Sequence, residues 1–90
     1  MSKAVVDPAE LRRFAHDLKR FNDTLGGQMS VLHGRLVALG QTWRDQEHQK
    51  FAEEFEQTLR VLTRFVDLSG KHIPFLIRKA ERIEEYLKQR

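Results

Sequence analysis

The residues from 52 to 87 carry a row of side chains, all apolar except Ser69, in an unbroken alternation of three- and four-residue steps. This spacing places side chains on one face of an α-helix, whereas a strand has a period of two. Sustained over this length, it predicts a long helix with a coiled-coil-like seam that must pack against another helix. The seam comprises Ala52, Phe55, Leu59, Leu62, Val66, Ser69, Ile73, Leu76, Ala80, Ile83 and Leu87.

A second stretch with helical spacing precedes this seam. Its apolar positions advance in heptads, except that the step from Leu25 to Met29 is one residue too long. Such a stutter unwinds a supercoil locally, and Gly26 and Gly27 beside it each cost a helix about 1 kcal/mol relative to alanine. We expect a bend or a close backbone approach there, or a tolerated weak point. The predicted seam comprises Leu11, Phe14, Leu18, Phe21, Leu25, Met29, Leu32, Leu36, Leu39 and Trp43.

Local signals mark where these two helices begin and end. Asp7 is a good N-cap, and Pro8 is tolerated in a first turn because its missing N–H would have no partner there. The stretch from Gly40 to Asp45 holds residues that stop or cap helices, with Asp45 or Thr42 as the cap of the second helix. A turn in this stretch lets the two seams face each other.

These limits predict a single all-α domain, an antiparallel two-helix hairpin. Pro74 is the difficulty, because an internal proline loses a hydrogen bond and clashes with the carbonyl group four residues earlier, at Gly70. Since the seam keeps its phase across the proline, we expect one helix with a kink; a break at Gly70 is the alternative. The predicted elements are a helix over about 8–39, a turn over 40–45, and a helix over about 46–88 with the kink near 70–74.

The second predicted helix carries another apolar row beside its seam, which runs from Phe51 to Tyr86. A two-helix hairpin covers only one such row, and a row left in water would form the kind of apolar patch that marks an interface. We therefore predict that two hairpins pair into a four-helix bundle, most simply a homodimer. The alternative is that the row packs under the first helix of a wide-faced hairpin. The predicted interface comprises Val61, Phe65, Leu68, His72 and Phe75.

Residues that carry catalysis or bind metals are sparse in this chain. It has no cysteine, and its four histidines show no metal-ligand spacing. The serines lack a neighbouring base, and there is no glycine-rich phosphate loop. We therefore expect no enzymatic activity, no metal and no cofactor.

The charge and hydropathy of the chain indicate which classes of partner it binds and where in the cell we expect it. A net charge of +3 is a mild bias, and the basic row Arg64, Lys71 and Arg78 is typical of a solvated helix face, so nucleic acid is a disfavoured partner. No run approaches a membrane span, and the first residues lack the apolar core of a secretory signal. We expect a cytoplasmic protein whose export, if it occurs, uses a leaderless route.

The features of the predicted hairpin match a known kind of protein. A chain of 90 residues with an Asp7-Pro8 start, two long helices, Trp43 in the turn and Phe51 and Phe55 soon after it resembles the WXG superfamily. These are the small Esx-like proteins of type VII secretion. The resemblance implies a helical hairpin that dimerises as a four-helix bundle and is handled by a secretion system.

The chain departs from the pattern of this superfamily at two positions. The Trp-x-Gly motif becomes Trp43-Arg44-Asp45, a change that is tolerated if the third position needs an N-cap. Exported members end with a tyrosine followed four residues later by an acid, whereas Tyr86 is followed by the basic Arg90. The export signal is therefore degenerate.

The resemblance and the second apolar row together predict a non-enzymatic protein–protein interaction module, a secretion-related effector or adaptor that acts as a dimer. Its partners would be a second copy or a related hairpin protein, and a secretion ATPase is a further candidate. The alternative function is a cytoplasmic structural or regulatory hairpin unrelated to secretion. A basic bundle associated with nucleic acid ranks third.

Overall fold

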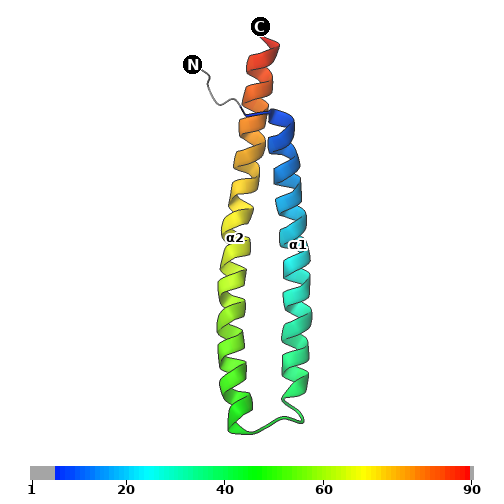
Figure 1. The fold of residues 1–90 in the computed structure, drawn as a ribbon, viewed down its shortest axis with the longest axis vertical. Helices are drawn as coiled ribbons and strands as arrows, with labels where there is room; N and C mark the ends of the chain where they lie inside the picture. Colours follow the sequence, from blue (N-terminus) through cyan, green and yellow to red (C-terminus); the bar gives the residue numbers. More distant parts are fainter. Residues whose placement is uncertain (1–5, 90) are drawn as a thin grey trace.

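The computed structural model describes residues 6–89, which form two long α-helices packed as one antiparallel hairpin (Figure 1). Helix α1 spans Pro8–Leu39 and helix α2 spans Gln46–Lys88. The Cα positions extend over 68 × 24 × 15 Å. The predicted all-α hairpin is confirmed, and its thickness is that of a single layer of helices.

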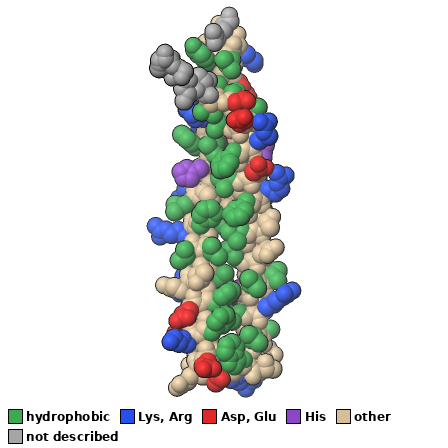
Figure 2. Space-filling view, in the orientation of Figure 1, with side chains coloured by type: hydrophobic (Ala, Val, Ile, Leu, Met, Phe, Trp, Pro, Cys, Tyr) green, Lys and Arg blue, Asp and Glu red, His purple; other side chains and the backbone are tan. Residues whose placement is uncertain are grey.

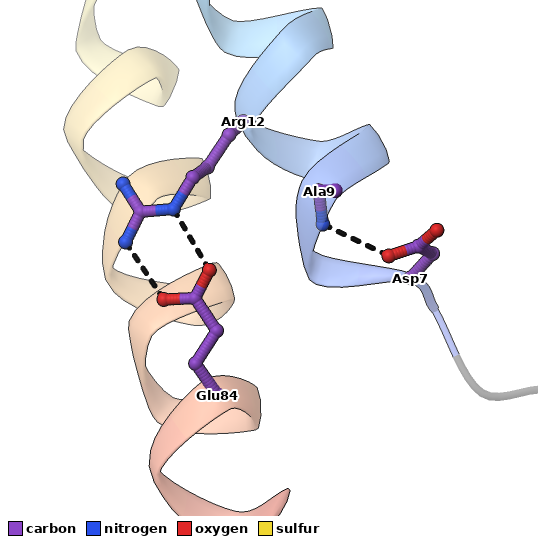
Figure 3. Close-up of polar contacts among 4 residues, drawn as sticks. All are labelled: Asp7, Ala9, Arg12 and Glu84. Carbon is purple, nitrogen blue, oxygen red and sulfur yellow. Dashed lines mark hydrogen bonds and ion pairs between the residues drawn. The ribbon is translucent and has the colours of Figure 1, made fainter.

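Helix α1 begins at an aspartate cap and ends at a glycine. The Asp7 carboxylate accepts a hydrogen bond of 2.9 Å from the backbone N–H of Ala9 (Figure 3). Pro8 takes the first helical position. At the other end, the Gly40 N–H donates to the carbonyl groups of Leu36 and Val37. These contacts satisfy backbone groups that a helix end leaves without partners.

Helix α2 is one continuous α-helix with Pro74 inside it. The residues around Gly70 remain helical, so the helix does not break there and the seam continues past Pro74 on the same face. The energetic cost of an internal proline is about 3 kcal/mol. The packing of a 43-residue amphipathic helix on α1 offsets this cost.

The inner face of α1 differs from the predicted seam. Phe14 and Phe21 are 58% and 54% exposed, whereas Ala15 and Asn22 are buried at 0% and 6%. The buried residues lie one position further along the chain, in a row with Leu36 at seven-residue spacing. With this row, the heptads continue through α1 without a stutter. The predicted stutter at 25–29 arose because the phenylalanines are more apolar than their neighbours.

Small and polar side chains let the helices approach closely at this inner face. Asn22 donates a hydrogen bond of 2.9 Å to the Ser69 hydroxyl, which donates in turn to the Val66 carbonyl group at 3.3 Å. Further toward the open end of the hairpin, Ala15 and Ala80 are both fully buried. Phenylalanine would not fit between helices this close, so the large rings of α1 lie outside.

An ion pair joins the helices near the open end of the hairpin. The Arg12 guanidinium donates two hydrogen bonds to Glu84, of 2.9 and 2.8 Å (Figure 3). These hydrogen bonds lower the pKa of Glu84 below its ordinary value of 4.5. Both side chains are more than a third exposed, so water screens the attraction between them.

The Arg12–Glu84 ion pair stabilises the fold at neutral pH and loses this effect in acid. Because the folded state has the lower pKa, the stabilisation is present above the ordinary pKa of 4.5 and is lost as the pH falls through the folded value. Glu84→Gln should therefore reduce the loss of stability on acidification below pH 4.5. Urea midpoints measured across this pH range test it, with the exposed Glu85→Gln as control. An equal loss of stability on acidification in the wild type and in Glu84→Gln would contradict this prediction.

Candidate interaction surface

One flank of the hairpin carries large apolar side chains from both helices. The Phe21 ring of α1 meets the Phe65 ring of α2 edge to face, with ring centroids 6.2 Å apart. Both rings are about half exposed, so they meet at the surface rather than in the interior. Residues seven apart share a helix face, which extends this flank along both helices. We call the following set the aromatic flank: Phe14, Phe21, Val31, Val61, Phe65, Leu68 and Phe75.

Hydrophobic side chains run along the length of the molecule over both helices, as Figure 2 shows. The chain exposes 7374 Å². A compact monomer of the same mass, 10.6 kDa, exposes roughly 5,500 Å². Among residues 6–89 no large side chain is fully buried. The hairpin alone therefore leaves more surface in water than a compact chain of its mass, and the aromatic flank is an exposed apolar part of that surface.

The opposite flank of the hairpin is polar and needs no cover. The Arg12–Glu84 ion pair lies on it, and nearer the turn the His33 Nε2 lies 3.3 Å from a Glu56 carboxylate oxygen. A shallow groove between the helices is lined by His33 and Glu56, and Gly26 forms part of its wall. The two flanks thus differ in chemistry, with ion pairs on one and aromatic rings on the other.

The structure places every residue of the predicted interface at the surface. Val61 is 64% exposed, and Phe65, Leu68 and Phe75 are between 45% and 48% exposed. His72 is exposed as well. These residues of α2 therefore do not pack under α1, as the alternative of a wide-faced hairpin would require.

The sequence interpretation missed the contribution of α1 to this flank. Phe14 and Phe21 were assigned to the seam between the helices, but they lie beside Phe65 on the outside. A signal for this was present: Ala15 and Asn22 stand in strict heptad spacing with Met29. The flank is consequently broader than the predicted interface.

The turn is organised by an aromatic stack. Trp43 is partly buried, and its ring centroid lies 5.0 Å from that of His48 and 5.9 Å from that of Phe51. Phe51 stacks in turn on Phe55 at 5.6 Å. The backbone N–H of Trp43 donates to the Leu39 carbonyl group at 2.9 Å. The tryptophan therefore links the end of α1 to the start of α2.

Asp45 is the N-cap of α2, which explains why an aspartate stands two residues after the tryptophan. Its backbone is extended, with φ −85° and ψ −177°, a conformation that does not require glycine. Its carboxylate accepts a hydrogen bond of 3.0 Å from the His48 N–H. Of the two caps considered from the sequence, Thr42 or Asp45, the structure shows Asp45.

Removing this cap should weaken the fold by a measurable amount. Asp45→Ala deletes the acceptor for the His48 N–H and should lower the free energy of unfolding by about 1 kcal/mol. Asp45→Asn keeps an acceptor and should lose far less. Chemical denaturation of the three proteins at one concentration tests this. Equal stability of the alanine variant and the wild type would show that the cap contributes nothing.

Tyr86 lies on the last turns of α2 and is 64% exposed. Its partner in the degenerate export signal, Arg90, lies outside the described residues. Among residues 6–89 the structure shows no group of three or more histidine, aspartate or glutamate side chains placed to hold a metal ion. Neither α1 nor α2 is apolar enough over a sufficient length to cross a membrane.

Comparison with known proteins gives one family. The sequence model of the family WXG100, described as "Proteins of 100 residues with WXG", matches residues 4–87. The match spans both helices and the turn. Neither a curated protein nor a solved structure matches the chain.

Proposed function

The chain belongs to the WXG100 family of small, helical, Esx-like proteins of type VII secretion, and we propose that it acts as a protein–protein interaction module through its aromatic flank. Proteins of this family are not enzymes. On this proposal the chain performs no catalysis and binds no cofactor. Its activity consists of presenting helix faces to other proteins.

The observation that carries the proposal is the exposed aromatic flank. Phe21 and Phe65 pack against each other, yet each leaves about half of its surface in water. Burial of apolar area stabilises a complex by roughly 25 cal/mol per Å². A second hairpin laid on this flank would cover these rings and produce a four-helix bundle with an interior that the single chain lacks.

Within secretion, we propose that the bundle is an effector or adaptor handled by a secretion ATPase. The exposed Tyr86 on the final turns of α2 supports this role, since a recognition residue must be accessible. A cytoplasmic structural or regulatory role is the second candidate, and the sequence favours it at one position, the basic Arg90 in place of an acid.

The distinguishing experiment is expression of the untagged protein in a bacterium with a type VII system. We expect the protein in the culture medium without a cytoplasmic lysis marker, and we expect Tyr86→Ala to reduce its amount. Lys88→Ala, which also alters an exposed residue of the last turns, is the control. Retention of the wild-type protein in the cells would reject the exported role and support the cytoplasmic candidate.

A further inference from the structure

The first half of α1 carries two neighbouring rows of side chains, and the less apolar row faces α2. Ala15 and Asn22 face inward, at 0% and 6% exposure, whereas Phe14 and Phe21 lie outside at 58% and 54%. Burial stabilises a phenylalanine ring more than it stabilises an alanine or an amide. The hydrophobic effect therefore favours the opposite orientation of this half of the helix.

A rotation about the helix axis exchanges the two rows. Leu18 and Leu25 are partly buried and lie beside both rows, so they belong to the inner face in either orientation. Successive residues of an α-helix are about 100° apart, and the centre of the inner face moves by about 60° when one row replaces the other. We call the result the turned orientation: the part of α1 before Gly26 is rotated so that Phe14 and Phe21 face α2.

The rotation would end at a pair of glycines. Beyond them, Met29 and Leu36 are inner residues in both orientations, so the second half of α1 keeps its place. A Cβ atom at Gly26 or Gly27 would meet no heavy atom within 4 Å apart from its neighbours in α1, so packing requires neither glycine. Glycine does lower the cost of a local change in backbone angles, which the rotation of half a helix needs.

Helix α2 presents small side chains where the rings would enter. Ser69 lies opposite Asn22, with which it shares a hydrogen bond of 2.9 Å. Ala80, fully buried, lies between this contact and the Arg12–Glu84 pair. The rings do not fit at the observed approach of the helices. Because the separation of packed helices follows the size of the side chains at the contact, a wider separation at these levels would admit them.

Two polar contacts hold the half-helix in the observed orientation. Asn22 is hydrogen-bonded to Ser69 and Arg12 to Glu84. Both contacts would be lost on rotation, since Arg12 and Asn22 leave the inner side. The first contact is incomplete, because the Asn22 side-chain oxygen is buried without a hydrogen-bond partner in the structure. A buried polar atom without a partner is costly, and the turned orientation avoids this cost.

We propose that the first half of α1 is a two-position device that controls access to the aromatic flank. In the observed orientation Phe14 and Phe21 are offered to a partner, and in the turned orientation they are withdrawn against α2. This device rests on the proposed function, because it regulates the same flank. A partner that covers the flank binds the observed orientation and stabilises it, while the free chain exchanges between the two.

Single thiols report the orientation, since the chain has no cysteine of its own. Ala15→Cys and Ala80→Cys both replace residues that are fully buried. Rotation exposes only the first, whereas unfolding or fraying of α1 exposes both, because Ala80 is covered by α1. The thiol of Ala15→Cys should react with a chromogenic aromatic disulfide at least about tenfold faster than that of Ala80→Cys. The ratio of the two rates is the quantity to measure.

Two changes should move this ratio in opposite directions. Ser69→Ala removes the partner of Asn22 and should raise the ratio about tenfold further. Replacement of both Gly26 and Gly27 by alanine should lower it, because alanine fits at both positions and favours the continuous helix. The rates are measured across a dilution series, since any partner on the flank, including a second copy, holds the observed orientation.

A ratio near one at the lowest chain concentration, in the otherwise unchanged chain and in the Ser69→Ala background, would overturn the two-position device. It would leave the proposed function intact, because the flank would then be open at all times. A ratio that rises with Ser69→Ala and falls with the paired alanines would support the device. The export experiment has a separate readout, so retention of the protein in the cells would reject the exported role without affecting this result.

Discussion

Phe65→Glu is expected to convert the protein into a monomer. Phe65 lies near the centre of the aromatic flank, where it meets Phe21 of its own chain. In the dimer the new carboxylate would be buried among apolar side chains without a partner, which costs several kcal/mol. Central aromatic residues are also those whose loss weakens interfaces most, by 2 kcal/mol or more. We expect the dissociation constant to rise by at least about a hundredfold.

Light scattering coupled to size exclusion measures this change. Gln57→Glu introduces the same charge at an exposed position on the outer side of α2 and should leave the mass unaltered. Circular dichroism shows whether the variant remains helical, and Phe65→Ala provides a milder change that weakens the dimer without a buried charge. A Phe65→Glu protein with the mass of the wild-type dimer would remove the flank as the interface.

Trp43→Ala is expected to lower the free energy of unfolding by about 2–3 kcal/mol. The loss of a fully buried tryptophan costs about 3–5 kcal/mol, and the ring of Trp43 is only partly buried. The variant loses the contacts with His48 and Phe51 that connect the helices at the turn. Urea unfolding followed by circular dichroism at fixed protein concentration measures the change, since association also affects the midpoint.

A conservative variant separates packing from other effects at the turn. Trp43→Phe keeps a ring beside Phe51. Its loss of stability should be less than about half of the loss in the alanine variant. A loss well below 1 kcal/mol for Trp43→Ala would show that the turn is organised without the indole.

The seam of α2 could be predicted because large apolar residues occupy most of its positions. Phe55, Leu59 and Leu62 leave little choice of face on a helix of period 3.6, and the structure places all three toward α1. Pro74 did not shift this face, because the phase of the seam continues beyond it.

The inner face of α1 could not be chosen from hydrophobicity alone. Phe14 and Ala15 are adjacent, and so are Phe21 and Asn22, so either row gives a helical period. In the structure the smaller residues face α2, where the Ser69 hydroxyl accepts a hydrogen bond from the Asn22 side-chain amide. This hydrogen bond offsets part of the cost of burying Asn22, whose side-chain oxygen has no hydrogen-bond partner in the structure. A single sequence does not show which helix positions face each other.

The row of α1 that faces α2 also decides where the candidate interaction surface lies. Once Phe14 and Phe21 are outside, α1 supplies three of the seven residues of the aromatic flank, and the surface becomes a face of the whole hairpin rather than a row on α2. The role of Asp45 was within reach of the sequence because capping depends on local residues, whereas the aromatic flank depends on the register of two helices.

The solution mass of the purified chain across a dilution series tests the central claim most directly. If a second copy covers the aromatic flank, as we propose, light scattering should give twice the chain mass of 10.6 kDa down to low micromolar concentration. A mass of 10.6 kDa at all concentrations, with the helical content retained, would contradict self-pairing through this flank.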